Sequence, residues 1–143
     1  MKIALSFVFL FAGFFIGKTQ QYKPVDEKSE IKFIIKNFGL NTSGSFKGLK
    51  GTIKFNPSDL PSSSFNVSVD VNTINTGIDS RDNHLKKEDY FFAEKYSTIN
   101  FVSTTITANQ NEYTVTGNLT IKGITKTVSF PFTVQSQDNG LIF

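Results

Sequence analysis

The feature that most constrains this chain is a repeated alternation of apolar and polar residues. Ile31, Phe33 and Ile35 fall on every second position between Glu30 and Lys36, so one side of this segment is apolar. A period of two predicts a β-strand with one buried face. The same period predicts further strands over residues 53–55, 65–71, 99–101, 113–121 and 128–134. No segment keeps the helical period over three turns.

Turn residues occupy the breaks between these segments. Gly48 and Gly51 flank one bend, residues 56–64 are rich in Asn, Pro, Ser and Asp, and residues 109–111 and 122–123 lie where hairpins should close. Many strands joined by tight turns predict an all-β, antiparallel sandwich or barrel. Composition does not choose between these two architectures.

The N-terminus has the pattern of a secretory signal. Met1 and Lys2 precede about fifteen mostly apolar residues, fewer than the roughly 20 that a membrane-spanning helix needs. We therefore predict a signal peptide over residues 1–20, cleaved between Lys18 and Tyr22, and one domain over residues 21–143. An uncleaved anchor is the alternative.

The predicted domain carries nearly balanced charge and no cysteine. Without Lys2 and Lys18 the 15 basic side chains become 13, against 12 acidic ones. Such charges, spread along strands, predict no concentrated patch for nucleic-acid phosphates. Because there is no cysteine, no disulfide can form and stability must come from apolar burial.

Phenylalanine is abundant, and the C-terminus looks incomplete. The sequence holds 16 phenylalanines, five of them in the N-terminal segment; the others suit a curved sheet with a wide apolar interior, and equally a plain Phe-rich core. Residues 137–140 predict a hairpin turn, but only Leu141, Ile142 and Phe143 follow. We expect the closing strands to lie outside this chain, so that residues 1–143 alone form no closed, soluble barrel.

Residues 77–101 form the most distinctive connection. Turn residues open it, a short helix is expected around Asn83–Asp89, and Tyr90, Phe91 and Phe92 add apolar bulk that should fold back onto a core. His84, the sole histidine, could act as a general base oriented by Asp82, but no activated nucleophile accompanies it.

No convergent set of metal ligands is present either, so we predict neither an enzyme, nor a metal site, nor a cofactor. A structural role is favoured, in which Asp79 or Asp82 caps the helix and Arg81 pairs with a carboxylate. Contact of these residues with the polar end of a ligand is the alternative.

Several blocks resemble the YceI-like family of bacterial exported proteins, in order from about Tyr22 to Val134. The most specific is TGIDSRDNHLKKEDYFF followed by EKY and an INF strand, and LTIKGITK is the second mark. The chain departs from the family pattern at Ala93, where aspartate is usual, and at Ser97, where proline is usual. Both positions lie in the connection, so they bear on its local geometry more than on the fold.

The resemblance implies a lipocalin-like antiparallel β-barrel, periplasmic or secreted, whose lumen holds an isoprenoid or similar long-chain lipid. The alternative is a structural or stress-associated exported barrel with a packed lumen and no ligand. A homodimer is left open as the oligomeric state.

The position of a residue on the apolar side of its predicted strand (strand parity), combined with the resemblance, selects candidate site residues. Phe91 or Phe92 is expected to plug one barrel end, where Arg81, Asp82 and His84 hold the connection. The predicted ligand-binding residues are Phe33, Phe46, Phe55, Val67, Val69, Phe91, Phe92, Phe101, Leu119, Phe130 and Phe132.

Overall fold

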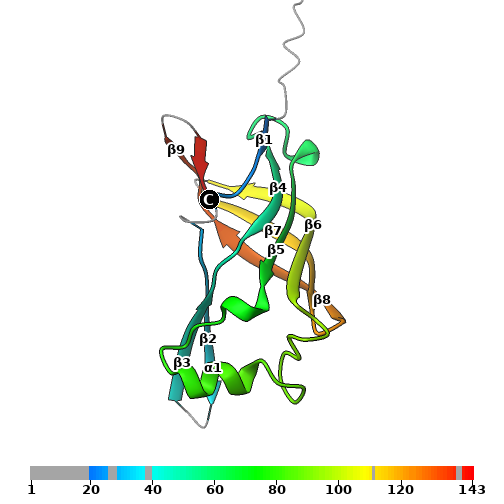
Figure 1. Cartoon of the computed structure of the whole chain (residues 1–143). Coiled ribbons are helices and arrows are strands. Elements are labelled where there is room, and N and C mark those ends of the chain that lie inside the picture. Colours follow the sequence, from blue (N-terminus) through cyan, green and yellow to red (C-terminus); the bar gives the residue numbers. More distant parts are fainter. Residues whose placement is uncertain (1–19, 26–28, 38–39, 111, 138–139) are drawn as a thin grey trace, which may run out of the picture.

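The computed structural model describes residues 20–25, 29–37, 40–110, 112–137 and 140–143. The predicted signal peptide lies outside the described residues except for Gln20. Strands dominate the remainder (Figure 1): β1 Gln20–Tyr22, β2 Ile31–Asn37, β3 Leu40–Phe46, β4 Lys50–Phe55, β5 Ser64–Asp70, β6 Thr98–Asn109, β7 Glu112–Ile121, β8 Ile124–Phe132, β9 Gln135–Gln137 and β10 Gly140–Ile142.

The strands form one six-stranded sheet and two separate hairpins. The sheet has the order β1-β4-β5-β6-β7-β8, and each neighbouring pair is antiparallel. The pairs β2–β3 and β9–β10 stand outside it. The antiparallel all-β prediction is thus confirmed. Within the described residues the sheets do not close, because β1 and β8 remain edge strands of the large sheet.

The hairpin between β7 and β8 follows directly from its turn residues. Lys122 and Gly123 are the two loop residues, and both have positive φ, at 50° and 75°. This backbone matches the twist of the flanking strands, and glycine adopts it without steric cost. Lys122-Gly123 therefore closes the hairpin that the sequence predicted.

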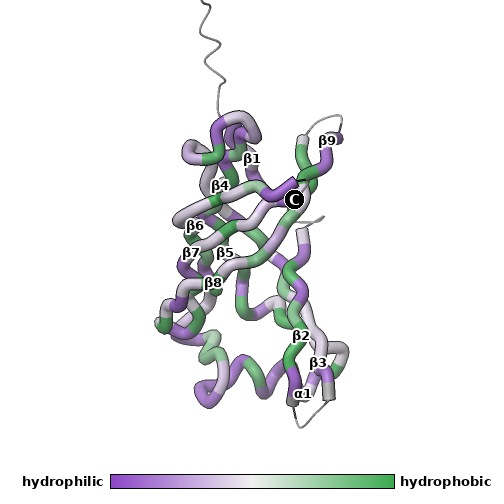
Figure 2. Tube along the Cα trace, turned by 180° about the vertical axis from the view of Figure 1, so that it is seen from behind, coloured by the Kyte–Doolittle hydropathy of each residue, from purple (hydrophilic) through white to green (hydrophobic). Residues whose placement is uncertain are grey.

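Parity places the main apolar cluster on the inner face of the sheet. Figure 2 shows hydrophobic and hydrophilic residues alternating along the strands. Val115 in β7 is fully buried, and Phe55 in β4 is 3 % exposed. We call this the sheet cluster; its buried members are Ile53, Phe55, Phe65, Phe101, Ile106 and Val115.

A second apolar cluster lies between the β2–β3 hairpin and the connection. Phe46, Val69 and Ile74 are its buried members, and we call it the hairpin cluster. Side chains from five other segments pack against them: Phe33, Leu49, Leu85, Phe91 and Ile99. The interior is therefore divided into two packed regions.

Two glycines allow close packing in this part of the fold. A Cβ at Gly51, where φ is +121°, would lie 2.1 Å from the Asn66 carbonyl oxygen, so β4 could not approach β5 with a larger residue there. A Cβ at Gly44 would lie 2.3 Å from Phe33 Cζ, because the phenyl ring crosses the glycine on the facing strand. Gly51 fits the bend that the sequence predicted, whereas Gly44 lies within the regular pairing of β2 with β3.

In the part of the chain that the structure describes, three short helical segments connect the strands. The one α-helix among them, α1 Asp79–Leu85, precedes the turns that lead into β6, and the 3-10 helices are η2 Leu60–Ser62 and η3 Val71–Thr73. The predicted helix around Asn83–Asp89 was placed too late in the sequence, because turns from Lys86 onward redirect the chain. Among the described residues, no helix has the length and hydropathy to span a bilayer.

Candidate functional site

Nine of the predicted ligand-binding residues lie on strands, whereas Phe91 and Phe92 lie in the connection, and their exposure differs widely. Phe46, Phe55, Val69 and Phe101 are buried, whereas Phe130 is 42 % exposed. The other predicted residues are partly buried: Phe33, Val67, Phe91, Phe92, Leu119 and Phe132. Parity thus identified side chains that face inward but not which of them stay uncovered.

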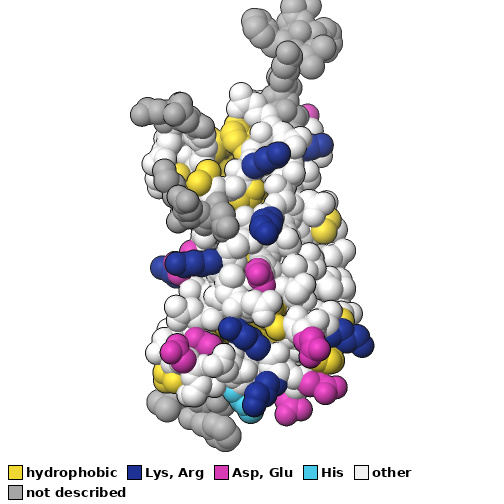
Figure 3. All heavy atoms as spheres, viewed as in Figure 1, with side chains coloured by type: hydrophobic (Ala, Val, Ile, Leu, Met, Phe, Trp, Pro, Cys, Tyr) yellow, Lys and Arg dark blue, Asp and Glu magenta, His cyan; other side chains and the backbone are white. Residues whose placement is uncertain are grey.

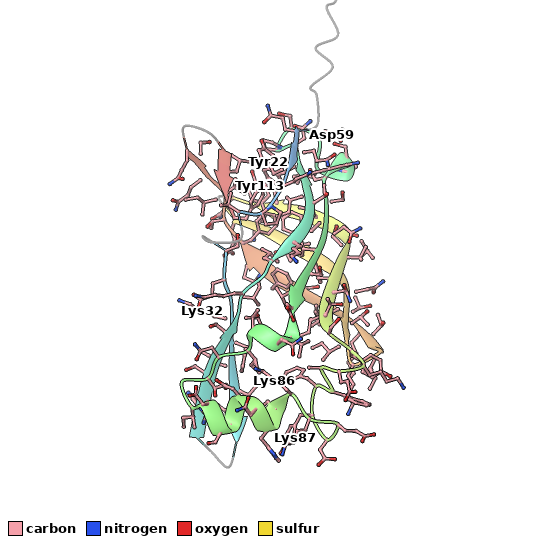
Figure 4. The ribbon with its side chains drawn as sticks, in the orientation of Figure 1. Tyr22, Lys32, Asp59, Lys86, Lys87 and Tyr113 are labelled. Carbon is pink, nitrogen blue, oxygen red and sulfur yellow. The ribbon has the colours of Figure 1, made fainter. Side chains whose placement is uncertain are left out.

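Aromatic rings fill the end of the interior near β1 and β10. The Phe55 ring lies 5.1 Å from the Tyr113 ring and 5.6 Å from the Phe143 ring, both edge-on. Tyr113 in turn stacks on Phe132 at 5.3 Å. Figure 4 shows Tyr22 and Tyr113 at this end of the molecule. Edge-on and offset ring pairs are favourable contacts, so this end is packed.

Phe130 occupies the middle of the inner face and is only half covered. Its ring lies 5.1 Å from that of buried Phe101, and its backbone pairs with Val115 in β7. No strand pairs with the other edge of β8 within the described part of the chain. Phe130 is therefore an exposed aromatic ring on the same side of β8 as partly buried Val128 and Phe132, and the apolar surface is open there.

A hollow of about 430 Å³ lies beside the packed aromatic end. Its lining combines apolar and aromatic residues (Tyr22, Phe55, Pro57, Tyr113, Val134 and Leu141) with polar ones (Gln20, Asn56 and Ser136). The hollow is therefore of mixed polarity, and aromatic rings line one part of it.

Sequence reasoning missed several residues of this region. Tyr113 and Phe65 lie on the alternating faces of their predicted strands, so parity could have selected them. Phe143 follows a turn and has no periodic context, yet its ring contacts those of Tyr22, Phe55 and Phe65. No sequence signal would have placed Phe143 in the core.

The polar residues of the connection converge on Thr76. The Asp82 carboxylate accepts hydrogen bonds from the backbone N–H and the hydroxyl of Thr76. Arg81 donates from Nε to Thr76 Oγ1 and from its terminal nitrogen to the Thr76 carbonyl, both at 2.7 Å. The two charged side chains therefore hold the segment before α1 against the helix.

The expected helix cap and ion pair are both wrong. The N-cap of α1 is Ile78, and no side chain caps it, because Asp82 lies inside the helix and bonds backward to Thr76. In the described residues the only ion pair joins Lys32 and Glu30, so Arg81 has no carboxylate partner there. Thr76 takes the place of that partner.

The two phenylalanines of the connection point to different neighbours. Phe91 meets Phe46 edge-on at 5.7 Å and so enters the hairpin cluster. Phe92, with φ of 52°, packs against Tyr96 at 6.0 Å. Of the two candidate plugs, Phe91 is the inward one. His84 is exposed, and its ring lies 5.0 Å from that of Tyr90.

A second hollow of about 340 Å³ lies outside this connection. Its lining is mainly polar: Thr73, Ile74, Asn75, Asp79, Asp82, Asn83 and Lys86. The described residues contain no group of three or more His, Cys, Asp or Glu side chains arranged to hold a metal ion. Asp82 is also committed to Thr76, so this hollow offers no evident catalytic set.

Comparisons with known proteins agree with this architecture. A crystal structure of BcnA from Burkholderia cenocepacia superposes with a TM-score of 0.71 at 34 % identity, covering 78 % of this chain and 70 % of that one. A polyisoprenoid binding domain from Saccharophagus degradans, implicated in plant cell wall breakdown, has a TM-score of 0.54 at 17 % identity, covering 82 % and 68 %. The latter likeness shows the fold alone.

A curated relative and a family model extend the match. The UPF0312 protein YE1254 of Yersinia enterocolitica is 32 % identical over 123 residues, which are 83 % of this chain and 64 % of that protein. The chain thus spans less than two thirds of this relative's length. The model of the YceI-like domain matches residues 22–142, nearly the whole predicted domain. The chain belongs to the YceI-like domain family.

Proposed function

We propose that this chain is an exported, non-catalytic binding protein that holds an isoprenoid or similar long-chain lipid against its inner face. The observation that carries the proposal is the position of Phe130, which faces inward beside buried Phe101 yet remains 42 % exposed. An apolar ligand lying along this face would remove that ring from water. The apolar segment at residues 3–17 supports export.

Apolar burial alone can supply the affinity. Each CH₂ group moved from water to an apolar surface contributes about 0.8 kcal/mol, so a long chain needs few polar contacts. The aromatic rings along the inner face provide such a surface. The relative from Saccharophagus is named as a polyisoprenoid binding domain, but the proposal rests on the aromatic face of this chain.

A packed interior without ligand is the second candidate. It is favoured by the ring contacts around Phe55 and Phe132, which fill one end of the interior. It predicts that the purified protein contains no lipid. It also predicts that Phe130 is covered by protein and by no ligand.

Organic extraction and mass spectrometry of the purified protein distinguish the two candidates. We expect a long-chain lipid in the extract, and its loss in the Phe130→Lys variant. Val102→Lys is the matched control, because Val102 is similarly exposed at 47 % but belongs to the opposite parity of β6 from Phe101. Unchanged lipid content in folded Phe130→Lys would refute the proposed site.

The non-catalytic part of the proposal has its own test. His84 is exposed and contacts Tyr90, so His84→Ala should keep both the fold and the bound lipid. A hydrolytic or redox activity that is lost in folded His84→Ala would overturn it.

A further inference from the structure

Five lysines lie on the outer sides of β2 and β4 and in the bend between β3 and β4, although the overall charge is nearly balanced. Lys32 and Lys36 share the side of β2 opposite Phe33, which packs inward on Phe46. The lysines of β4 likewise lie on the side opposite its buried residues. These four lysines, together with Lys47 in the bend after β3 and Ile34 in β2, are what we call the lysine face. Its members are Lys32, Ile34, Lys36, Lys47, Lys50 and Lys54.

Basic side chains outnumber acidic ones in this part of the sequence. Residues 29–55 contain five lysines and a single acidic residue, Glu30. Figure 3 shows basic side chains along the face above α1, whereas acidic side chains gather mainly around the α1 end. The strands that pair with β2 and β4 contribute no further lysine, so the charge comes from the alternation within β2 and β4 and from the bend that joins β3 to β4.

Acidic side chains compensate this face only in part. Glu30 pairs with Lys32 at 3.3 Å. A hydrogen bond from Ser45, followed by the nearby Lys32 and Lys47, lowers the pKa of the Glu30 carboxyl, so it neutralises part of the charge. Asp70 borders the face beside Gly48 and accepts hydrogen bonds from Asn72. The remaining lysines form no other ion pair within the described chain.

An exposed isoleucine lies in the middle of the β2 lysines. Ile34 is 71 % exposed, on the same side of the strand as Lys32 and Lys36. Its cross-strand partner is Ser43, which is also exposed and gives little apolar cover. Figure 4 shows Lys32 at the outer side of β2, away from the sheet. An apolar tip between cationic groups fits the boundary between lipid headgroups and acyl chains.

We propose that the lysine face docks the protein on an anionic lipid bilayer, with Ile34 at the headgroup boundary. Charge complementarity selects the partner, since each lysine near an anionic membrane surface strengthens binding by roughly five-fold. Nucleic acid would satisfy the lysines but would leave Ile34 without a role. Docking uses the outer face and does not depend on ligand binding inside.

A probe at position 34 tests the docking directly. The chain has no cysteine, so Ile34→Cys carries the only thiol for a polarity-sensitive fluorophore. Vesicles of equal parts phosphatidylglycerol and phosphatidylcholine should shift its emission to the blue. Pure phosphatidylcholine, or the anionic vesicles at about 1 M salt, should not, because salt screens the attraction. Ile124→Cys, at a site 63 % exposed in β8, is the control and should not shift.

The position of the probe makes the result specific. It reports only its own surroundings, so insertion of the apolar N-terminal segment elsewhere in the vesicle does not by itself shift it. No shift at position 34, or an equal shift at position 124, would overturn the proposal. A shift that grows with protein concentration without vesicles would mean that a second copy covers the face, and would also overturn it.

Matched charge variants test the lysines themselves. Lys36→Gln, Lys50→Gln and Lys54→Gln together should weaken binding to the anionic vesicles roughly 100-fold. The control triple is Lys86→Gln, Lys87→Gln and Lys95→Gln, which removes the same charge from the α1 end and should change binding only a few-fold. Equal losses in the two triples would refute the proposal. Lipid extraction of both triples reports on the inner face separately, so failure of docking and failure of ligand binding are distinguishable.

Discussion

The sheet cluster and the hairpin cluster are held together in different ways. The sheet cluster lies on strands joined by a continuous antiparallel ladder, so its packing and its hydrogen bonds support the same arrangement. The β2–β3 hairpin is not part of that ladder; a bridge between Ser45 and Asn75 and side-chain packing attach it. We expect the hairpin cluster to open locally at lower free energy than the sheet cluster.

The largest expected effect is the loss of a ring from the sheet cluster. Phe55 is 3 % exposed and contacts the rings of Tyr113, Phe132 and Phe143. Phe55→Ala should lower the free energy of unfolding by about 4 kcal/mol, because it leaves a cavity. Denaturant unfolding measures this. Phe130→Ala, at a half-exposed position, is the control and should lower the free energy of unfolding less. An equal decrease would contradict the inference that Phe55 is more tightly packed than Phe130.

Removing the Asp82 carboxylate should destabilise the hairpin side selectively. Asp82 is 8 % exposed, and it accepts two hydrogen bonds from Thr76. Asp82→Ala should cost about 2 kcal/mol, since the Thr76 N–H loses a charged acceptor. Hydrogen exchange should show faster opening of α1 and β2–β3 than of β5–β7. Uniform loss of protection would mean that the two clusters unfold as one.

A methyl group at Gly44 should disturb the hairpin cluster alone. The new Cβ would meet the Phe33 ring, which must then shift from its contact with Phe46 at 5.3 Å. Gly44→Ala should cost about 1 kcal/mol, since overpacking is partly relieved by movement of the ring. Thermal unfolding measures the change. Gly140→Ala is the control, because no atom lies within 4 Å of the new Cβ. A comparable loss of stability in this control would show that the cost of Gly44→Ala does not come from contact with Phe33.

The smallest expected effect is a pH dependence from Glu30. Hydrogen bonding from Ser45, followed by Lys32, lowers the pKa of its carboxyl below the ordinary value of 4.5. The contribution to stability is therefore present above pH 4.5 and is lost as the pH falls through the lowered native value. Glu30→Gln should flatten this part of the stability curve slightly. An unchanged curve would show that Glu30 does not couple to folding.

Sequence reasoning located strands more reliably than it located contacts. The alternating segments of β4 to β8 were found because their apolar residues recur with a period of two. The strand β3 was missed as an alternating segment, because LNTSGSF contains only two large apolar residues. Its place is decided by pairing with β2, where Gly44 accommodates Phe33.

In the candidate site, too, the sequence pattern predicted which side of a strand faces inward but not which contacts its side chains make. Parity correctly assigned Phe55 and Phe101 to the interior, where both are buried. It could not foresee that Phe130 stays exposed, because exposure depends on which strand covers the neighbouring position. It also predicted a cap and an ion pair for Asp82 and Arg81, whereas the nearby Thr76 satisfies both side chains.

The alternation of apolar and polar residues and the short motifs were enough to predict the antiparallel β architecture, the inward side of each main strand and the family. Tertiary contacts were needed to show that the interior divides into two clusters and that Phe91 rather than Phe92 enters one of them. Those features arise from strand pairing and chain reversal. Both act between residues far apart in sequence, where local patterns carry no information.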